Sequence, residues 1–118
     1  MKLIIAGTRH LDVSTSFIND VLGNCLLSRQ DISEVVCGMA RGIDTCGKLW
    51  AKAWSIPVAE FPADWNKYGK SAGVIRNSEM AKYGDALLLI WDGVSKGSSN
   101  MKGHMKYKTI YEVIIKCP

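Results

Sequence analysis

The sequence has few of the features that mark a secreted or membrane-bound protein. Its longest apolar run, Ala86 to Trp91, is far short of the roughly 20 residues needed to cross a bilayer. No long apolar stretch of the signal-peptide kind follows Met1. We therefore expect a cytoplasmic protein that does not associate with a membrane. Its 118 residues, 47% of them apolar, can fill one core, so we expect a single domain over residues 1–118.

Cysteine and histidine are present, but not in the patterns of a disulfide framework or a metal site. There is no C-x-x-C pair, and His10 and His104 fit no common ligand spacing. We expect buried thiols, no metal and no cofactor. The four cysteines are Cys25, Cys37, Cys46 and Cys117.

The net charge of +4 lies entirely in the second half of the chain. Residues 1–60 hold six Lys or Arg and six Asp or Glu, whereas residues 61–118 hold nine and five. This excess suits an anionic ligand or a nucleic-acid surface, and it equally suits a solvated helix face. Much of it comes from Lys96, Lys102, Lys106 and Lys108.

Short apolar segments alternate along the chain with segments of helical periodicity. The apolar segments predict five strands, at 2–6, 34–37, 57–61, 85–91 and about 112–116. The periodic segments predict helices at 12–28 with Asp12 as N-cap, 43–54, 72–82 and 99–107, and residues 62–70 are expected to form a loop. The alternation is typical of an α/β fold with a mostly parallel sheet and right-handed crossovers, and the apolar run at 85–91 is the candidate for its middle strand.

Three glycine-bearing loops should meet at the carboxyl edge of this sheet. They are residues 7–9, 38–44 and 92–98. Ligands bind at that edge in open parallel sheets, and glycine lets backbone N–H groups approach an anion. The loops therefore predict a phosphate site, with the alternative that the glycines only permit tight turns. None of them matches G-x-G-x-x-G or G-x-x-x-x-G-K-[ST], so neither a dinucleotide fingerprint nor a P-loop is present.

Several side chains near these loops have a chemistry that suits a nucleotide. Arg9 can form a bidentate contact with phosphate, or an ion pair with Asp44 or Asp92. Asp44, at a helix start, suits a ribose hydroxyl better than a phosphate, because two negative charges repel. The strongest phosphate candidate is the segment 95–98, with hydroxyls and backbone donors just before a helix. Trp65, with Tyr68, can stack on a base or simply cover an edge of the core.

The chain resembles the YspA-like branch of the SLOG superfamily, named from the Smf/DprA DNA-processing proteins and the LOG phosphoribohydrolases. The resemblance covers nearly the whole chain and rests on residues 4–9, 37–44, 61–65, 68–73, 75–77 and 95–98. It implies a three-layer, Rossmann-like fold with helices on both faces and a pocket for nucleotide-derived ligands, of the kind suspected in bacterial and phage conflict systems.

The resemblance also assigns site roles, and Arg76 and Asn77 enter on that ground alone; their alternative is a helix start tied to the preceding loop. In this branch a second glycine usually follows Gly38, where this chain has Met39, which would narrow the pocket or shield its floor. The candidate ligand-binding residues are Gly7, Thr8, Arg9, Gly38, Met39, Arg41, Gly42, Asp44, Trp65, Arg76, Asn77, Ser95, Gly97 and Ser98.

The second departure concerns catalysis. LOG enzymes carry a glutamate two residues after the threonine of their phosphate loop, and aligning Gly97 and Ser98 with that loop places Asn100 there. An amide cannot act as a general base or as the charged partner of an oxocarbenium-like transition state. Asp44 and Asp92 are the candidate catalytic carboxylates that remain.

Three functions follow in order of preference. The first is a module that senses or sequesters a nucleotide-like ligand. The second is a hydrolase acting on an N-glycosidic or phosphate bond, and the third is single-strand nucleic-acid binding through lysines and exposed aromatics. A homo-oligomer that associates through the face bearing Trp50 and Trp54 is left open.

Overall fold

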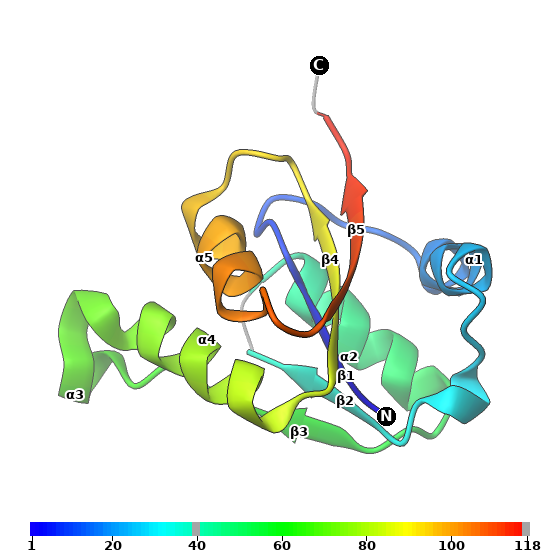
Figure 1. Ribbon diagram of the computed structural model, residues 1–118, viewed down its shortest axis with the longest axis horizontal. Helices are drawn as coiled ribbons and strands as arrows, with labels where there is room; N and C mark the ends of the chain where they lie inside the picture. Colours follow the sequence, from blue (N-terminus) through cyan, green and yellow to red (C-terminus); the bar gives the residue numbers. More distant parts are fainter. Residues whose placement is uncertain (39–40, 117–118) are drawn as a thin grey trace.

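A single parallel sheet forms the centre of the protein. The computed structural model describes residues 1–38 and 41–116. The sheet has the strand order β3-β2-β1-β4-β5 and every pair of neighbouring strands is parallel (Figure 1). The strands are β1 (Lys2–Gly7), β2 (Glu34–Cys37), β3 (Val58–Glu60), β4 (Ala86–Trp91) and β5 (Thr109–Ile114). The predicted number and parallel arrangement of the strands are thus confirmed.

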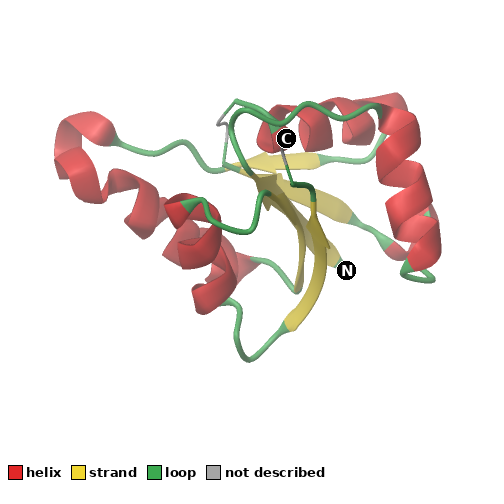
Figure 2. Cartoon of the chain, turned by 90° about the horizontal axis from the view of Figure 1, so that it is seen from above, coloured by secondary structure: helices red, strands yellow, loops and turns green. Residues whose placement is uncertain are grey.

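Helices cover both faces of this sheet. One face carries α1 (Thr15–Asn24) and α2 (Ile43–Ala53), and the other carries α4 (Ala72–Tyr83) and α5 (Lys96–His104) (Figure 2). The short α3 (Trp65–Tyr68) extends the α4 side beyond the sheet. The predicted three-layer, Rossmann-like α/β fold is therefore confirmed.

The core is divided by the alternation of side chains along each strand. On β1, Leu3 and Ile5 pack with α1 and α2, whereas Ile4 and Ala6 pack with α4 and α5. The whole of β4 is buried because both of its faces are covered in the same way. The prediction that β4 is the middle strand is nevertheless wrong, since β1 has that position. An unbroken apolar run indicates an interior strand but does not give its rank in the sheet.

The first helix is shorter than predicted and is capped by another residue. The hydroxyl of Ser14, not Asp12, accepts the hydrogen bond from the amide of Phe17, at 3.0 Å. Asp12 instead accepts from the Cys46 thiol, at 3.2 Å. The helix ends at Asn24 and not near Ser28, because Leu26 has a φ of 60°.

Three further segments differ from the prediction. Residues 62–70 are not all loop: Asp64 accepts from the amide of Lys67, at 3.1 Å, and so caps α3, which a 3₁₀ turn (Gly69–Ser71) follows. α5 begins at Lys96, three residues earlier than predicted, so Gly97 and Ser98 lie in its first turn. β5 likewise begins three residues early.

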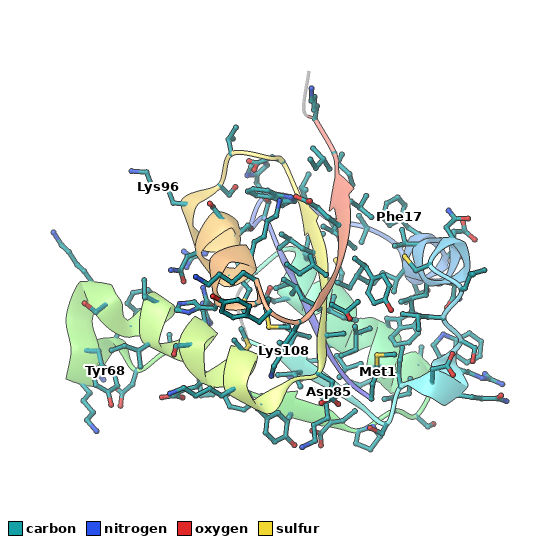
Figure 3. The ribbon with its side chains drawn as sticks, viewed as in Figure 1. Met1, Phe17, Tyr68, Asp85, Lys96 and Lys108 are labelled. Carbon is teal, nitrogen blue, oxygen red and sulfur yellow. The ribbon has the colours of Figure 1, made fainter. Side chains whose placement is uncertain are left out.

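Two of the lysines in the second half of the chain, Lys102 and Lys108, make structural contacts. Lys102 pairs with Glu112 at 3.0 Å. Lys108 donates to the carbonyls of Ala81 and Gly84, at 2.6 and 2.7 Å, at the end of α4 (Figure 3). Lys96 extends away from the start of α5 (Figure 3). The solvated helix face and the nucleic-acid surface both stay predictions.

Of the two tryptophans on the face proposed for self-association, only Trp54 is exposed. Asn19 Oδ1 accepts from the indole nitrogens of both Trp50 and Trp54, at 2.7 and 3.1 Å. Trp50 is 1% exposed and Trp54 37% exposed. Trp50 is therefore part of the core and is not available to a second copy, and a homo-oligomer stays a prediction.

The cysteines of the described residues are not in disulfides: Cys37 and Cys46 are buried and Cys25 is partly buried, whereas Cys117 lies outside the described residues. Burial raises the pKa of Cys46, which disfavours its thiolate. Across residues 1–38 and 41–116, no helix has the length and apolar composition to span a membrane.

Candidate functional site

The candidate site lies where β1 and β4 send the chain to opposite faces of the sheet. β1 leads to α1 on one face, and its neighbour β4 leads to α5 on the other. Such a switch point leaves a crevice at the carboxyl ends of the strands. A cavity of about 330 Å³ opens there, which we call the first cavity. Its lining residues are Ala6, Gly7, Thr8, Arg9, His10, Asp44, Arg76, Asn77, Met80, Ser95, Gly97, Ser98 and Met101.

A carboxylate fixes the loop between β4 and α5. Asp92 accepts hydrogen bonds from the amides of Val94 and Ser95, at 3.0 and 2.8 Å, and from the Ser95 hydroxyl at 2.8 Å. These bonds lower the pKa of Asp92 from 3.8 to about 2, and the bond from the Val94 amide has the largest effect. The Asp92 amide in turn donates to Thr8 Oγ1, at 3.1 Å, which ties the loop to the end of β1. Such an occupied and weakly basic carboxylate organises the loop and is a poor general base.

The N-terminus of α5 is left uncapped by this arrangement. Ser95 is the N-cap, but its hydroxyl is turned to Asp92 and to Thr8 Oγ1, which is 3.2 Å away. The first backbone bond of the helix runs from the Ser99 amide to the Ser95 carbonyl, at 3.0 Å. The amides of residues 96, 97 and 98 therefore have no partner within the helix, and two of these residues line the first cavity.

The glycines at the site serve two different purposes. A β-carbon on Gly7 would lie 1.8 Å from the Ile90 carbonyl oxygen, and one on Gly42, whose φ is 77°, would lie 2.5 Å from the carbonyl oxygens of Thr8 and Arg9. Packing within the protein thus requires these two. At Gly97 a β-carbon would meet no atom within 4 Å, so the space beside that backbone is open. Of these glycines, Gly97 is the one that suits close approach of a ligand.

Arg76 and Asn77 join α4 to both neighbouring loops. Arg76 Nη1 donates to the carbonyl of Gly38, and Arg76 Nε donates to Asn77 Oδ1 at 3.0 Å. Asn77 Nδ2 then donates to Asn100 Oδ1 at 3.1 Å and to the Gly97 carbonyl at 3.4 Å. Both residues lie in the second turn of α4, so the alternative prediction that they form the start of this helix is wrong. Apart from the resemblance, no pattern in the sequence singles them out.

The electrostatics of Arg76 are set by its partial burial. Burial lowers the pKa of this guanidinium, Asp44 opposes that effect and Arg9 adds to it. Arg76 thus lies near both a buried carboxylate and a second guanidinium. Arg9 itself is exposed, and no described carboxylate lies within 4 Å of its guanidinium nitrogens. The predicted alternative of an Arg9 ion pair with Asp44 or Asp92 is therefore wrong.

A second cavity, of about 480 Å³, adjoins the first and shares Arg9 and Arg76 with it. It is lined by Arg9, Gly38, Arg41, Pro62, Ala63, Trp65 and Arg76. Trp65 is 51% exposed there, at the start of α3 and not in a loop. Tyr68 lies in a separate hollow between α3 and α4.

The structure brings together most of the residues that the sequence indicates. Nine of them line the first cavity, and Gly38, Arg41 and Trp65 line the second. Gly42 packs under the loop after β1, and Met39 lies outside the described residues. Sequence reasoning missed His10, whose Nε2 lies 3.8 Å from Asp92 Oδ2, and the apolar floor of Ala6, Met80 and Met101. In the sequence, only their positions could have indicated them: His10 directly follows Arg9, and the three apolar residues lie on the core-facing sides of their strand or helices.

The fold and the site define an α/β domain of the Rossmann-like class with a polar cleft at its topological switch point. Residues 1–68, more than half of the chain, match the model of the YAcAr family, described as the YspA, cpYpsA-related SLOG family. The chain belongs to this family, as its resemblance predicts. The matched part runs from β1 through α3 and leaves out Arg76, Asn77 and the start of α5. Comparison with curated proteins and with solved structures gave no match. Membership suggests a role in binding or processing a nucleotide-related ligand.

Proposed function

We propose that the protein binds a nucleotide or nucleotide-derived ligand with a phosphate group at the first turn of α5, and that it senses or sequesters this ligand. The observation that carries the proposal is the uncapped N-terminus of α5, whose N-cap hydroxyl is held by Asp92 and Thr8. Two of the residues with unpartnered amides, Gly97 and Ser98, line the first cavity together with the positive end of the helix dipole, and an anion would satisfy both the amides and the dipole.

The other side chains of the first cavity fit the rest of such a ligand. Arg9 and Arg76 bring positive charge for the phosphate, and Arg76 is already oriented by Gly38 and Asn77. Asp44 is 5% exposed and can accept from a ribose hydroxyl. A cavity of about 330 Å³ falls within the size range of small-molecule sites.

A ligand screen tests the proposal. The protein would be melted alone and with nucleoside mono-, di- and triphosphates, NAD, ADP-ribose and cyclic nucleotides, and each mixture would then be analysed by mass spectrometry. We expect at least one compound to raise the melting temperature and to be recovered intact; at 100 times its Kd it adds about 2.7 kcal/mol to stability. No shift with any compound would contradict the proposal.

Hydrolysis of the ligand is the second candidate function, and one observation favours it. Asp44 is a buried carboxylate in the first cavity, and it is the one carboxylate among the described lining residues. Asn100 is an amide bonded to Asn77, and Asp92 is held by its loop, so Asp44 is left as the candidate base. Recovery of base plus ribose phosphate, lost in Asp44→Asn, would establish hydrolysis over sensing. Among residues 1–38 and 41–116, no comparable contact favours binding of single-stranded nucleic acid.

A further inference from the structure

The second cavity has an unusual balance of charge. Three of its seven described lining residues are arginines (Arg9, Arg41 and Arg76), and none is acidic. The first cavity, in contrast, contains Asp44 beside its cations. The second cavity is therefore the more positive of the two, although the first has the helix N-terminus.

Among the described residues, none of these three guanidinium groups has a carboxylate within 4 Å, and Asp44 acts on Arg76 only from a greater distance. The ion pairs there lie elsewhere: Lys48 with Glu60, Lys102 with Glu112, and His10 with Asp92. Like charges that converge on one hollow repel one another, and a bound anion would relieve that repulsion. Arginine is also the residue best shaped for bidentate binding of phosphate.

An aromatic surface lies beside these charges. A β-carbon on Gly73, in the first turn of α4, would lie 3.6 Å from Trp65 Cη2 and 3.9 Å from Arg76 Nη2. The indole edge and the guanidinium thus flank the same point of the helix. With half of its surface exposed, Trp65 offers a flat face on which a base can stack.

We propose that the ligand spans both cavities and is a nucleotide with at least two phosphate groups. One phosphate lies at the first turn of α5, a second lies among Arg9, Arg41 and Arg76, and the base stacks on Trp65. Arg9 and Arg76 line both cavities and connect the two phosphate positions. This inference rests on the proposed function and adds the ligand class to it.

The test compares nucleoside 5′-diphosphates with the matching monophosphates for adenine, guanine, cytosine and uracil, by calorimetric titration. We expect the protein to bind one diphosphate at least tenfold more tightly than its monophosphate. Arg41→Gln, at an exposed residue that lines only the second cavity, should remove at least tenfold of the diphosphate affinity. The control is Arg29→Gln, the same change before β2 at the opposite edge of the sheet, which should leave that affinity unchanged.

The possible failures separate the two proposals. If a monophosphate binds and its diphosphate has no higher affinity, the second phosphate position is refuted and the proposed function stands. Unchanged diphosphate affinity in Arg41→Gln would have the same meaning. If none of the eight nucleotides binds but a compound of the wider screen does, the second phosphate position is overturned and the proposed function stands. If no compound of the wider screen binds either, both proposals are overturned.

Discussion

Substitution of Gly97 by alanine should make the free protein more stable and its complex weaker. Gly97 is the second residue of α5, its φ is not in the left-handed region, and a β-carbon there would meet no atom within 4 Å. Alanine is preferred over glycine in helices by up to about 1 kcal/mol, and by about 0.4–1 kcal/mol through the unfolded state alone. At this end position we expect about 0.5 kcal/mol, or a rise of roughly 2–4 °C in melting temperature.

The effect on binding has the opposite sign. The added methyl group would occupy the open space through which a phosphate reaches the amides of the first turn of α5. A hydrogen bond to a charged group contributes about 1.5–3 kcal/mol, so its loss should weaken ligand binding by roughly 10- to 150-fold. The measurement is a pair: thermal unfolding without ligand, and titration with the ligand that the screen identifies.

The same helix offers a matched control for this pair. Gly103 is exposed, a β-carbon there would also meet no atom within 4 Å, and it lines neither cavity. Gly103→Ala should therefore stabilise the protein without changing its affinity. If Gly97→Ala binds as tightly as the parent protein, the ligand does not approach the backbone of α5 and the phosphate assignment is refuted. A loss of stability would refute the steric argument instead.

Three further predictions follow from contacts at the same edge of the sheet. Arg9→Ala should reduce ligand affinity at least tenfold and move the melting temperature by only a few degrees, because Arg9 is exposed; a large loss of stability with unchanged titration curves would make its role structural. Gly38→Ala should weaken ligand binding, since its β-carbon would lie 2.6 Å from Arg76 Nη1 and displace that guanidinium; equal affinities by titration would show that Arg76 is not needed where it lies. In the folded protein the pKa of Asp92 is lowered from 3.8 to about 2, so its contribution to stability is present above about pH 4 and is lost as the pH falls towards 2. In Asp92→Asn, the free energy of unfolding measured with urea should therefore depend less on pH between about 4 and about 2. If that pH dependence is the same as in the parent protein, Asp92 is not its cause.

The strands and most helices could be predicted because apolar periodicity reports directly which faces are buried. The run from Ala86 to Trp91 identifies an interior strand, and the stripe on α2 gives that helix within one residue. Helix starts were less predictable, because several polar residues compete to cap them. Asp12 and Ser14 are both good N-caps, and the choice depends on the Cys46 thiol, which binds Asp12 from a distant part of the chain.

Within the site, loops that follow strands were predictable and contacts between elements were not. Parallel topology places the segments after β1, β2 and β4 at one edge, so Thr8, Arg9 and Ser95 could be expected to meet. Arg76 and Asn77 reach that edge from the side of α4, and helical periodicity alone assigns them no role. Their place depends on hydrogen bonds to Gly38 and Gly97, two loop residues that only the folded chain brings near.

The distribution of hydrogen bonds favours binding over catalysis at this site. A general base needs a carboxylate whose lone pairs are available and whose pKa is close to neutral pH. Asp92 is the reverse, because it accepts from two amides and a hydroxyl and has a pKa of about 2. Those bonds also keep the Ser95 hydroxyl away from the first turn of α5, and so leave its amides open to an anion. We therefore infer that Asp92 organises the proposed binding site, and Asp44 is left as the carboxylate on which any hydrolysis would depend.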